Sequence, residues 1–180
     1  MNIEYLKTAV EDYRVAAVTP TSKYTIRKIL GAMEPTHTSI VEYGAGDGVI
    51  TREILKRIPA RGSLIAIERN EHFAEELRAI GDARLTIVND DVRIASKSLL
   101  RFGLTPLHLV ISGIPFSFFK PEDRESIIRD THRALNSNGV FVVYQYSLLM
   151  LSLLKKYFSK VEWHFEPRNI PPYFVMIARK

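Results

Sequence analysis

The sequence predicts an α/β fold, in which a mostly parallel sheet of seven strands ends in an antiparallel hairpin and carries helices on both faces. Short β-branched runs alternate with helical patterns, which implies parallel strands joined by right-handed crossovers. The last two runs have no helical pattern between them, which predicts a C-terminal hairpin. The length of 180 residues and the hydrophobic content of 46% favour one domain over residues 1–180, with residues 1–34 as an N-terminal helical extension.

The individual elements follow from the β-branched runs and from the helical spacing between them. Ile50, Ile54 and Ile58 keep the four-residue spacing of one helical face, and a second helix is expected to start at Pro121. The apolar face of that second helix comprises Ile127, Ile128, Thr131 and Leu135. The expected strands are residues 39–43, 64–68, 85–89, 107–112, 139–146, 161–165 and 173–179.

The residues before the first strand predict a helical segment that breaks near Thr19 and Pro20. One face of its pattern is apolar and comprises Ile3, Leu6, Val10 and Tyr13. This face either packs on the domain or lets residues 1–30 lie on an anionic membrane surface. In the second case, the basic residues near the lipid head groups are Lys23, Arg27 and Lys28.

Composition and charge exclude several classes of protein. The chain has no cysteine, which excludes disulfides, cysteine-ligated zinc and a thiolate nucleophile and is compatible with a reducing cytoplasm. An export signal is not expected because the N-terminus carries charges, and the longest uncharged span, residues 139–154, is too short to cross a bilayer. No metal is expected because the histidines are scattered. We expect a cytoplasmic protein whose net charge of +5 either favours an anionic partner, such as RNA or the inner membrane surface, or reflects only a solvated basic surface.

The strongest local signal is VEYGAGDGVI, residues 41–50, where a strand ends and a helix begins around Gly44, Gly46 and Gly48. Glycine allows backbone torsions and a close approach that side chains would block, so a ligand can lie against this turn and face the helix N-terminus. A dinucleotide-binding fingerprint needs its third glycine at position 49, which is Val49. The motif therefore predicts a ligand site and argues against a nicotinamide or flavin cofactor.

Two further strands end in acidic residues at the same edge of the predicted sheet, the edge at which open α/β sheets bind ligands. Glu68 ends the second strand, where its carboxylate can accept both hydroxyls of a ribose. Asp91 follows the third strand, where it can receive an adenine amino group, can cap the next helix, or can do both. Glu42, at the end of the first strand, either contacts the ligand or fixes the glycine turn.

The fourth strand ends in ISGIPFSFF, residues 111–119, which combines Gly113 and Pro115 with an aromatic residue, Phe116, that we expect to be exposed. Such a junction is a poor way to continue a sheet and predicts the mouth of a pocket. Phe116 with Phe118 and Phe119 either forms an apolar entry for acyl chains or packs against the following helix.

Together these motifs resemble the class I S-adenosylmethionine-dependent methyltransferases, whose Rossmann-like fold carries E-x-G-x-G-x-G, acidic residues at the tips of the second and third strands, and a closing hairpin. The resemblance covers residues 39–180. Within this class, the chain is most similar to the small soluble bacterial phospholipid N-methyltransferases. The shared strings are RVAAVTPTS at 14–22, ISGIP at 111–115, FVVYQY at 141–146 and NIPP at 169–172.

The resemblance implies a role for each matching residue. The cofactor would contact Glu42, Gly44, Gly46, Gly48, Glu68, Arg69, Asp91, Val92 and Ser112. Ser112 and Gly113 would lie under the sulfonium, and Tyr146, which shares a strand face with Tyr144, would lie near the target amine. These three, Ser112, Gly113 and Tyr146, are the expected catalytic residues. Either Tyr146 or water would take the proton of the ammonium, and the product would be S-adenosylhomocysteine.

The end of the fourth strand separates two substrate classes. Ribosomal RNA adenine dimethylases, which the chain resembles more distantly, have Asn-Leu-Pro-Tyr there, and the Asn carbonyl accepts from the adenine amine. This chain has Gly113 at that Asn position and Phe116 at the Tyr position. An adenine amine is a weak nucleophile that needs the acceptor, whereas a deprotonated alkyl amine mainly needs positioning.

The resemblance therefore implies an N-methyltransferase that acts on an amine, with a phospholipid such as phosphatidylethanolamine as the leading substrate. The alternatives are methylation of ribosomal RNA adenine, which is less expected, or of a small molecule. A third alternative, from another class, is a protein that binds the cofactor or nucleic acid without catalysis.

Overall fold

The computed structural model describes residues 21–102 and 106–180. The strands are β1 Ser39–Tyr43, β2 Ser63–Ile67, β3 Leu85–Val88, β4 Leu107–Ser112, β5 Leu135–Gln145, β6 Lys160–Glu166 and β7 Tyr173–Arg179. The α-helices are α3 Lys23–Leu30, α4 Val49–Leu55, α5 Glu71–Arg78, α6 Val92–Ala95, α7 Pro121–Ala134 and α8 Leu151–Tyr157. Two 3-10 helices are η1 Ser96–Phe102 and η2 Phe116–Phe118.

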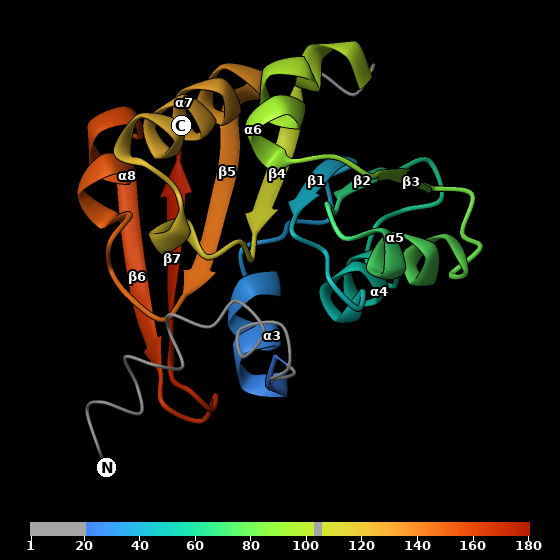
Figure 1. Ribbon diagram of the computed structural model, residues 1–180, viewed down its shortest axis with the longest axis horizontal. Helices are drawn as coiled ribbons and strands as arrows, with labels where there is room; N and C mark the ends of the chain where they lie inside the picture. The colour runs from blue at the N-terminus through green and yellow to red at the C-terminus, as the bar shows by residue number, and fades with distance from the viewer. Residues whose placement is uncertain (1–20, 103–105) are drawn as a thin grey trace.

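The strands form one seven-stranded sheet in the order β3-β2-β1-β4-β5-β7-β6. All neighbouring pairs from β3 to β5 are parallel. β7 is antiparallel to both β5 and β6, so it is the one reversed strand among those that the structure describes. The predicted fold is confirmed, and the structure adds that the hairpin enters the sheet through its second strand, which leaves β6 at the edge (Figure 1).

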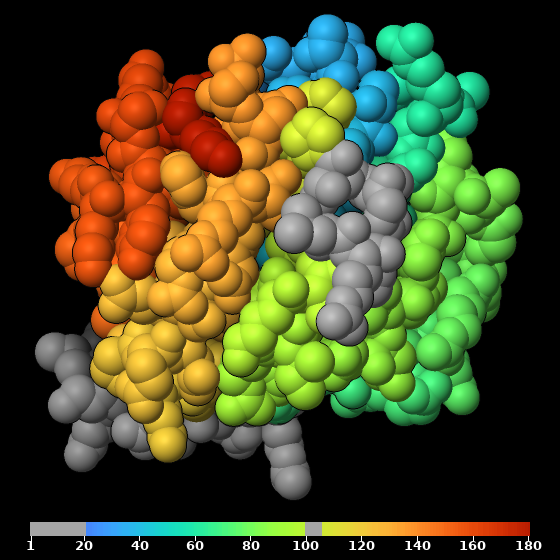
Figure 2. Space-filling view, turned by 90° about the horizontal axis from the view of Figure 1, so that it is seen from above, coloured from blue at the N-terminus to red at the C-terminus, as the bar shows by residue number. Residues whose placement is uncertain are grey.

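Helices cover both faces of the sheet, with α3, α4 and α5 on one side and α6, α7 and α8 on the other (Figure 1). Adjacent residues Ile40 and Val41 of β1 belong to the two different core layers, as the alternation of a strand requires. Because both faces are covered, every residue of β1 is buried. Seen from the edge where the parallel strands begin, the orange and red C-terminal segments lie on one side and the green segments on the other (Figure 2).

The boundary between α7 and β5 differs from the sequence prediction. Helix α7 ends at Ala134, and Leu135, which we expected on its apolar face, already belongs to β5. The register between β4 and β5 shifts between Leu107 and Leu109. This irregularity lets β5 begin before the predicted start at Gly139. Pairing with β4 has therefore overridden the helical pattern.

Helix α3 is held against the β6–β7 loop by one buried amide. The Oδ1 of Asn169 accepts from the backbone N–H of Ser22 at 2.9 Å and from the Thr25 hydroxyl at 3.0 Å. Its Nδ2 donates to the carbonyl of Pro171 at 2.9 Å. Asn169 thus provides hydrogen-bond partners for polar groups at the start of the helix and in the loop at the same time.

An ion pair adds to this contact and uses one of the basic residues expected at a membrane. Lys28 pairs with the buried Glu166 at 2.9 Å, so its charge is engaged within the fold, whereas Lys23 and Arg27 are exposed. The predicted apolar face from Ile3 to Tyr13 lies outside the described residues. In the two ranges that the structure covers, no helix is long and apolar enough to span a membrane.

Replacing Asn169 by alanine should lower the free energy of unfolding by about 2 kcal/mol, because buried donors at Ser22 and Thr25 would lose their acceptor. Urea unfolding followed by circular dichroism measures this loss. The matched control is Asn138→Ala at an exposed position, which should change stability by less than about 0.5 kcal/mol. An equal change in the two variants would contradict the anchoring role of Asn169.

Candidate active site

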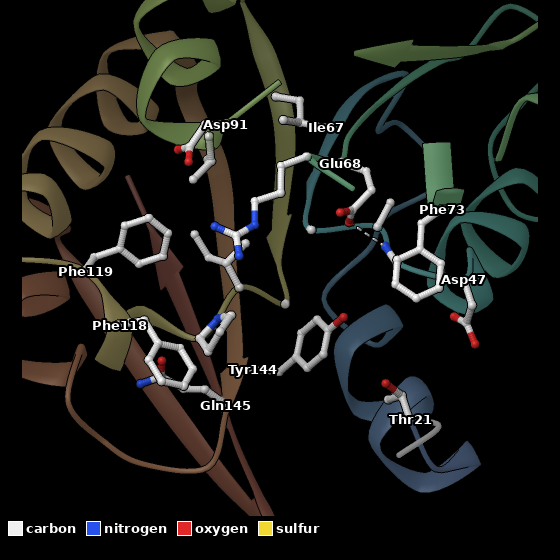
Figure 3. A pocket seen from close by; sticks show the side chains of 18 of the residues that line it. Thr21, Asp47, Ile67, Glu68, Phe73, Asp91, Phe118, Phe119, Tyr144 and Gln145 are labelled. Carbon is white, nitrogen blue, oxygen red and sulfur yellow. Dashed lines mark hydrogen bonds between the residues drawn. The ribbon is translucent and has the colours of Figure 1, made fainter. Parts of the chain in front are cut away.

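A cleft of about 260 Å³ opens at the carboxyl edge of the sheet, beside the ends of β1, β2, β4 and β5. It lies where the strand order turns from β1 to β4, the position at which open α/β sheets bind ligands. Figure 3 shows its two walls, with Phe118 and Gln145 on one side and Phe73 and Asp47 on the other. Gly44 and Gly46 of the glycine turn line this cleft together with Glu68 and Asp91, as the sequence predicts, whereas Gly48 does not.

The glycine turn after β1 has left-handed backbone torsions at each glycine. The φ angle is 71° at Gly44, 53° at Gly46 and 77° at Gly48, a region that side chains disfavour. A Cβ atom at Gly44 would lie 2.7 Å from Cγ2 of Ile114, whereas one at Gly46 would meet nothing within 4 Å. Gly44 therefore permits close packing of two loops, and Gly46 presents an open backbone that a ligand can approach.

Glu68 connects two loops of the cleft. Its Oε2 accepts from the N–H of Gly46 at 2.9 Å (Figure 3), and its Oε1 accepts from the N–H of Asn70 at 2.8 Å. Asn70 in turn caps α5 by accepting from the backbone N–H of His72. Each carboxylate oxygen can accept more than one hydrogen bond, so Glu68 retains capacity for the hydroxyls of a ligand. The ribose contact stays a prediction.

Asp91 is the N-cap of α6, which confirms one of its two expected roles. Its Oδ1 accepts from the N–H of Arg93 at 2.9 Å. The Arg93 guanidinium also donates to both carboxylate oxygens, at 2.9 and 2.7 Å, and this hydrogen bonding lowers the pKa of the Asp91 carboxyl. Val92 lines the cleft beside Asp91. The contact of these residues with an adenine ring stays a prediction.

Three of the expected site residues, Glu42, Gly48 and Ser112, are buried and are not among the described residues that line the cleft. Glu42 Oε2 accepts from the Thr51 hydroxyl at 2.6 Å, whereas its Oε1 has no hydrogen-bond partner among the residues that the structure covers. Burial raises the pKa of Glu42 to about 8. Because Thr51 belongs to α4, the observed bond supports the turn-fixing alternative for Glu42. The Oγ of Ser112 is likewise buried and without a described partner.

Gly113 and Tyr144 fit so closely that the space at position 113 admits no side chain. A Cβ atom on Gly113 would lie 2.2 Å from the hydroxyl oxygen of Tyr144 and 2.6 Å from its Cζ. Strand register explains this contact, because Ser112 pairs with Val143 and the next residues on each strand are Gly113 and Tyr144. Both residues line the cleft. Burial raises the pKa of Tyr144, so its hydroxyl is neutral at physiological pH.

Tyr146, the expected catalytic tyrosine, lines the cleft next to Tyr173. Tyr173 donates its hydroxyl hydrogen to the Tyr146 oxygen at 3.0 Å, and the two rings stack with centroids 4.6 Å apart. Tyr144 meets the Tyr173 ring edge to face at 5.8 Å. Burial raises the pKa of Tyr146, which disfavours its phenolate as a general base. A catalytic role for Tyr146 stays a prediction.

The aromatic residues after β4 correct one expectation. Phe116, which we expected to be exposed, is fully buried in the core, whereas Phe118 is 46% exposed. The reason is η2, because successive side chains of a 3-10 helix point to different sides. Phe116 therefore takes the packing role, while Phe118 and Phe119 line the cleft.

Acidic side chains outnumber basic ones among the described residues that line the cleft. Arg69, an expected cofactor contact, lines it together with Arg93. The acidic lining residues are Asp47, Glu68, Asp90 and Asp91. A concave surface with this balance attracts cations.

Several lining residues escaped the sequence analysis as site residues, notably Thr21, Phe73, Tyr144 and Gln145. They come from three segments, and only Phe73 lies outside every quoted motif, because Thr21 belongs to RVAAVTPTS at 14–22 and the other two belong to FVVYQY at 141–146. Alternation along β5 was the available signal for Tyr144, because it places Tyr144 on the same face as Tyr146. Only the tertiary fold brings Thr21 and Phe73 to the end of β5.

Comparison with known sequences identifies a family. Residues 40–139 match the family model described as a methyltransferase domain. An ornithine lipid N-methyltransferase from Singulisphaera acidiphila is 29% identical over 162 residues, which cover 88% of this chain and 84% of the relative.

Solved structures share the fold. The precorrin-6y C5,15-methyltransferase of Geobacter metallireducens superposes with a TM-score of 0.72 and 20% identity, over 91% of each chain. The 1,6-didemethyltoxoflavin-N1-methyltransferase of Burkholderia thailandensis, solved with S-adenosylhomocysteine bound, gives a TM-score of 0.70 with 17% identity, over 98% of this chain and 86% of that one.

The burial of Glu42 predicts how stability depends on pH. The unfolded chain releases the Glu42 proton near pH 4.5 and the folded chain keeps it to about 8, so the free energy of unfolding should fall as pH rises through this window. Glu42→Gln removes the titrating proton and should flatten this slope and raise stability at the upper end of the window. Urea unfolding at several pH values measures both effects.

A control of opposite sign is Glu53→Gln. Hydrogen bonds from Arg57 and Lys56 lower the pKa of Glu53, so this variant should lose a little stability at the upper end of the same window. A slope that is unchanged in Glu42→Gln would refute the proposed titration.

Proposed function

The chain belongs to the methyltransferase domain family, and we propose that this S-adenosylmethionine-dependent enzyme methylates the amine of a lipid head group such as phosphatidylethanolamine. One observation carries the choice of acceptor: an acidic cleft that suits an ammonium group opens under an exposed aromatic residue, Phe118, that suits an acyl chain. The relative named as an ornithine lipid N-methyltransferase supports the same class of acceptor.

The cleft residues after β1, β2 and β3 fit the cofactor. The open backbone at Gly46 leaves room for the methionine end, and Glu68 has acceptor capacity for ribose hydroxyls next to that turn. Asp91 and Val92 line the side assigned to the adenine ring. When bound, S-adenosylmethionine supplies an electrophilic methyl group that moves by in-line displacement and leaves S-adenosylhomocysteine.

The end of β4 favours an alkyl amine over an adenine base. Gly113 provides no amide acceptor, and Tyr144 excludes a side chain that would provide one. The acidic lining attracts a protonated amine. The residues here need to orient the amine, and water takes its proton because the nearby tyrosine hydroxyls are neutral.

Access to a lipid requires contact with its membrane. Phe118 and Phe119 provide an apolar side to the cleft where acyl chains can pass. We propose that residues 1–30 approach the anionic inner surface of the membrane from the cytoplasm, and the exposed Lys23 and Arg27 support that orientation.

Glu68→Gln should weaken the affinity for S-adenosylmethionine by about tenfold or more, because a charge-assisted acceptor is replaced by a neutral amide. The amide oxygen can keep one of the two loop hydrogen bonds, so the fold should persist. Isothermal titration calorimetry measures the affinity, and thermal melting verifies the fold. The matched control is Glu71→Gln, which removes an exposed carboxylate paired with Arg78 and should leave the affinity unchanged. Equal affinity in wild type and Glu68→Gln would refute the ribose contact.

The acceptor class is tested by incubating the protein with methyl-labelled S-adenosylmethionine and separate pools of phosphatidylethanolamine vesicles, RNA and small amines. We expect label in the lipid pool. Label confined to RNA or to small amines would replace the lipid proposal with one of those acceptors. Cofactor binding without transfer to any pool would contradict catalysis on these acceptors.

A further inference from the structure

The hydroxyl of Tyr144 occupies the space in which a side chain at position 113 would begin. Its oxygen lies 2.2 Å from the ideal Cβ position of Gly113, closer than any real Cβ contact. Figure 3 shows the Tyr144 ring projecting into the cleft, with its oxygen directed toward the side that carries Glu68. The chain therefore has a polar group at the end of β4, although the residue there is glycine.

Three contacts hold the Tyr144 ring in this position. Gly113 lies directly against the hydroxyl end of the ring, and Tyr173 packs edge to face against it at 5.8 Å. The hydroxyl also interacts with the side chain of Thr21, which lines the same cleft. A group that is fixed before the substrate arrives loses little freedom on binding, so it can orient a substrate effectively.

Tyr144 and Tyr146 differ in what their oxygens already do. The Tyr146 oxygen accepts the hydrogen of Tyr173 at 3.0 Å and is engaged in that pair. Burial raises the pKa of Tyr144, and its hydrogen bond with Thr21 acts in the opposite direction, as donation from Thr21 to the phenol oxygen does; that oxygen can accept a second hydrogen bond. Because the Tyr144 hydroxyl lies against Gly113 at the end of β4, it is the better placed of the two to accept a hydrogen from a substrate there.

Building on the proposed function, we propose that the Tyr144 hydroxyl orients the acceptor amine by accepting one of its N–H hydrogens beside Gly113. A deprotonated primary amine has one lone pair and two N–H groups. Donation of one N–H to Tyr144 restricts rotation about the C–N bond and directs the lone pair at the methyl group that it attacks. Tyr144 takes no proton in this role, because its hydroxyl remains neutral throughout.

This role depends on how many hydrogens the amine carries. Primary and secondary amines have an N–H to donate, whereas a dimethylated tertiary amine has none. Tyr144 should therefore assist the first and second methyl transfers and should not assist a third. A residue that only supported the fold would affect all three transfers equally.

The experiment compares wild type with Tyr144→Phe on vesicles of phosphatidylethanolamine and of its monomethyl and dimethyl derivatives. We expect kcat to fall about tenfold on the first two lipids, the rate equivalent of one hydrogen bond, and to stay within about twofold on the third. Calorimetry should show unchanged affinity for S-adenosylmethionine. The matched control is Tyr157→Phe on α8, which removes a hydroxyl that donates to Glu125 at 2.7 Å and should leave all three rates unchanged.

Each other outcome overturns the inference. An equal fall on all three lipids, or a loss of cofactor affinity, would assign Tyr144 a structural role. If Tyr144→Phe and the control variant show the same rates on the first two lipids, the Tyr144 hydroxyl does not contact the amine. If the wild type does not carry out the third transfer, a tenfold fall on the first two lipids with unchanged cofactor affinity supports the inference. Any other result on those two lipids overturns it. A wild type that methylates none of these lipids would overturn the proposed lipid acceptor, and the inference would fall with it.

Discussion

The cleft depends on the divergence of the two connections that follow β1 and β4 at the carboxyl edge of the sheet. The chain leaves β1 for α4 on one face and leaves β4 for α7 on the other, so the two connections diverge and no described helix covers the gap between them. Gly44 lets the loops come together just below this gap, because any side chain there would strike Ile114. The acidic residues and the tyrosines come within reach of one ligand only because this gap stays open.

The carboxylates of the cleft support the architecture of the surrounding loops. Glu68 bonds the glycine turn and the start of α5, and Asp91 caps α6 while holding Arg93. Glu42 sits behind them and bonds Thr51 of α4. Loops that are fixed by such bonds need little rearrangement when a ligand arrives, which is the basis of electrostatic preorganisation. Removing one of these carboxylates therefore tests local structure and binding together.

Features with local causes could be predicted from the sequence, and features set by pairing could not. The strands and the glycine turn follow from β-branched runs and from torsions that only glycine accepts readily. The choice between Phe116 and Phe118 depends on the turn of η2, and the fate of Leu135 depends on pairing with β4. The seating of Tyr144 over Gly113 likewise arises from the β4–β5 register, which no single segment specifies.

The place of β7 in the sheet has a consequence for assembly. β6 is hydrogen-bonded to β7 alone among the described strands, so β6 cannot join the sheet until β7 has docked against β5. Tyr173, the first residue of β7, also supports two tyrosines of the cleft. During synthesis the first five strands can associate earlier, but the wall beside β5 is completed only after β7 has left the ribosome. The tyrosine side of the cleft is therefore completed later than the side formed by the glycine turn, Glu68 and Asp91.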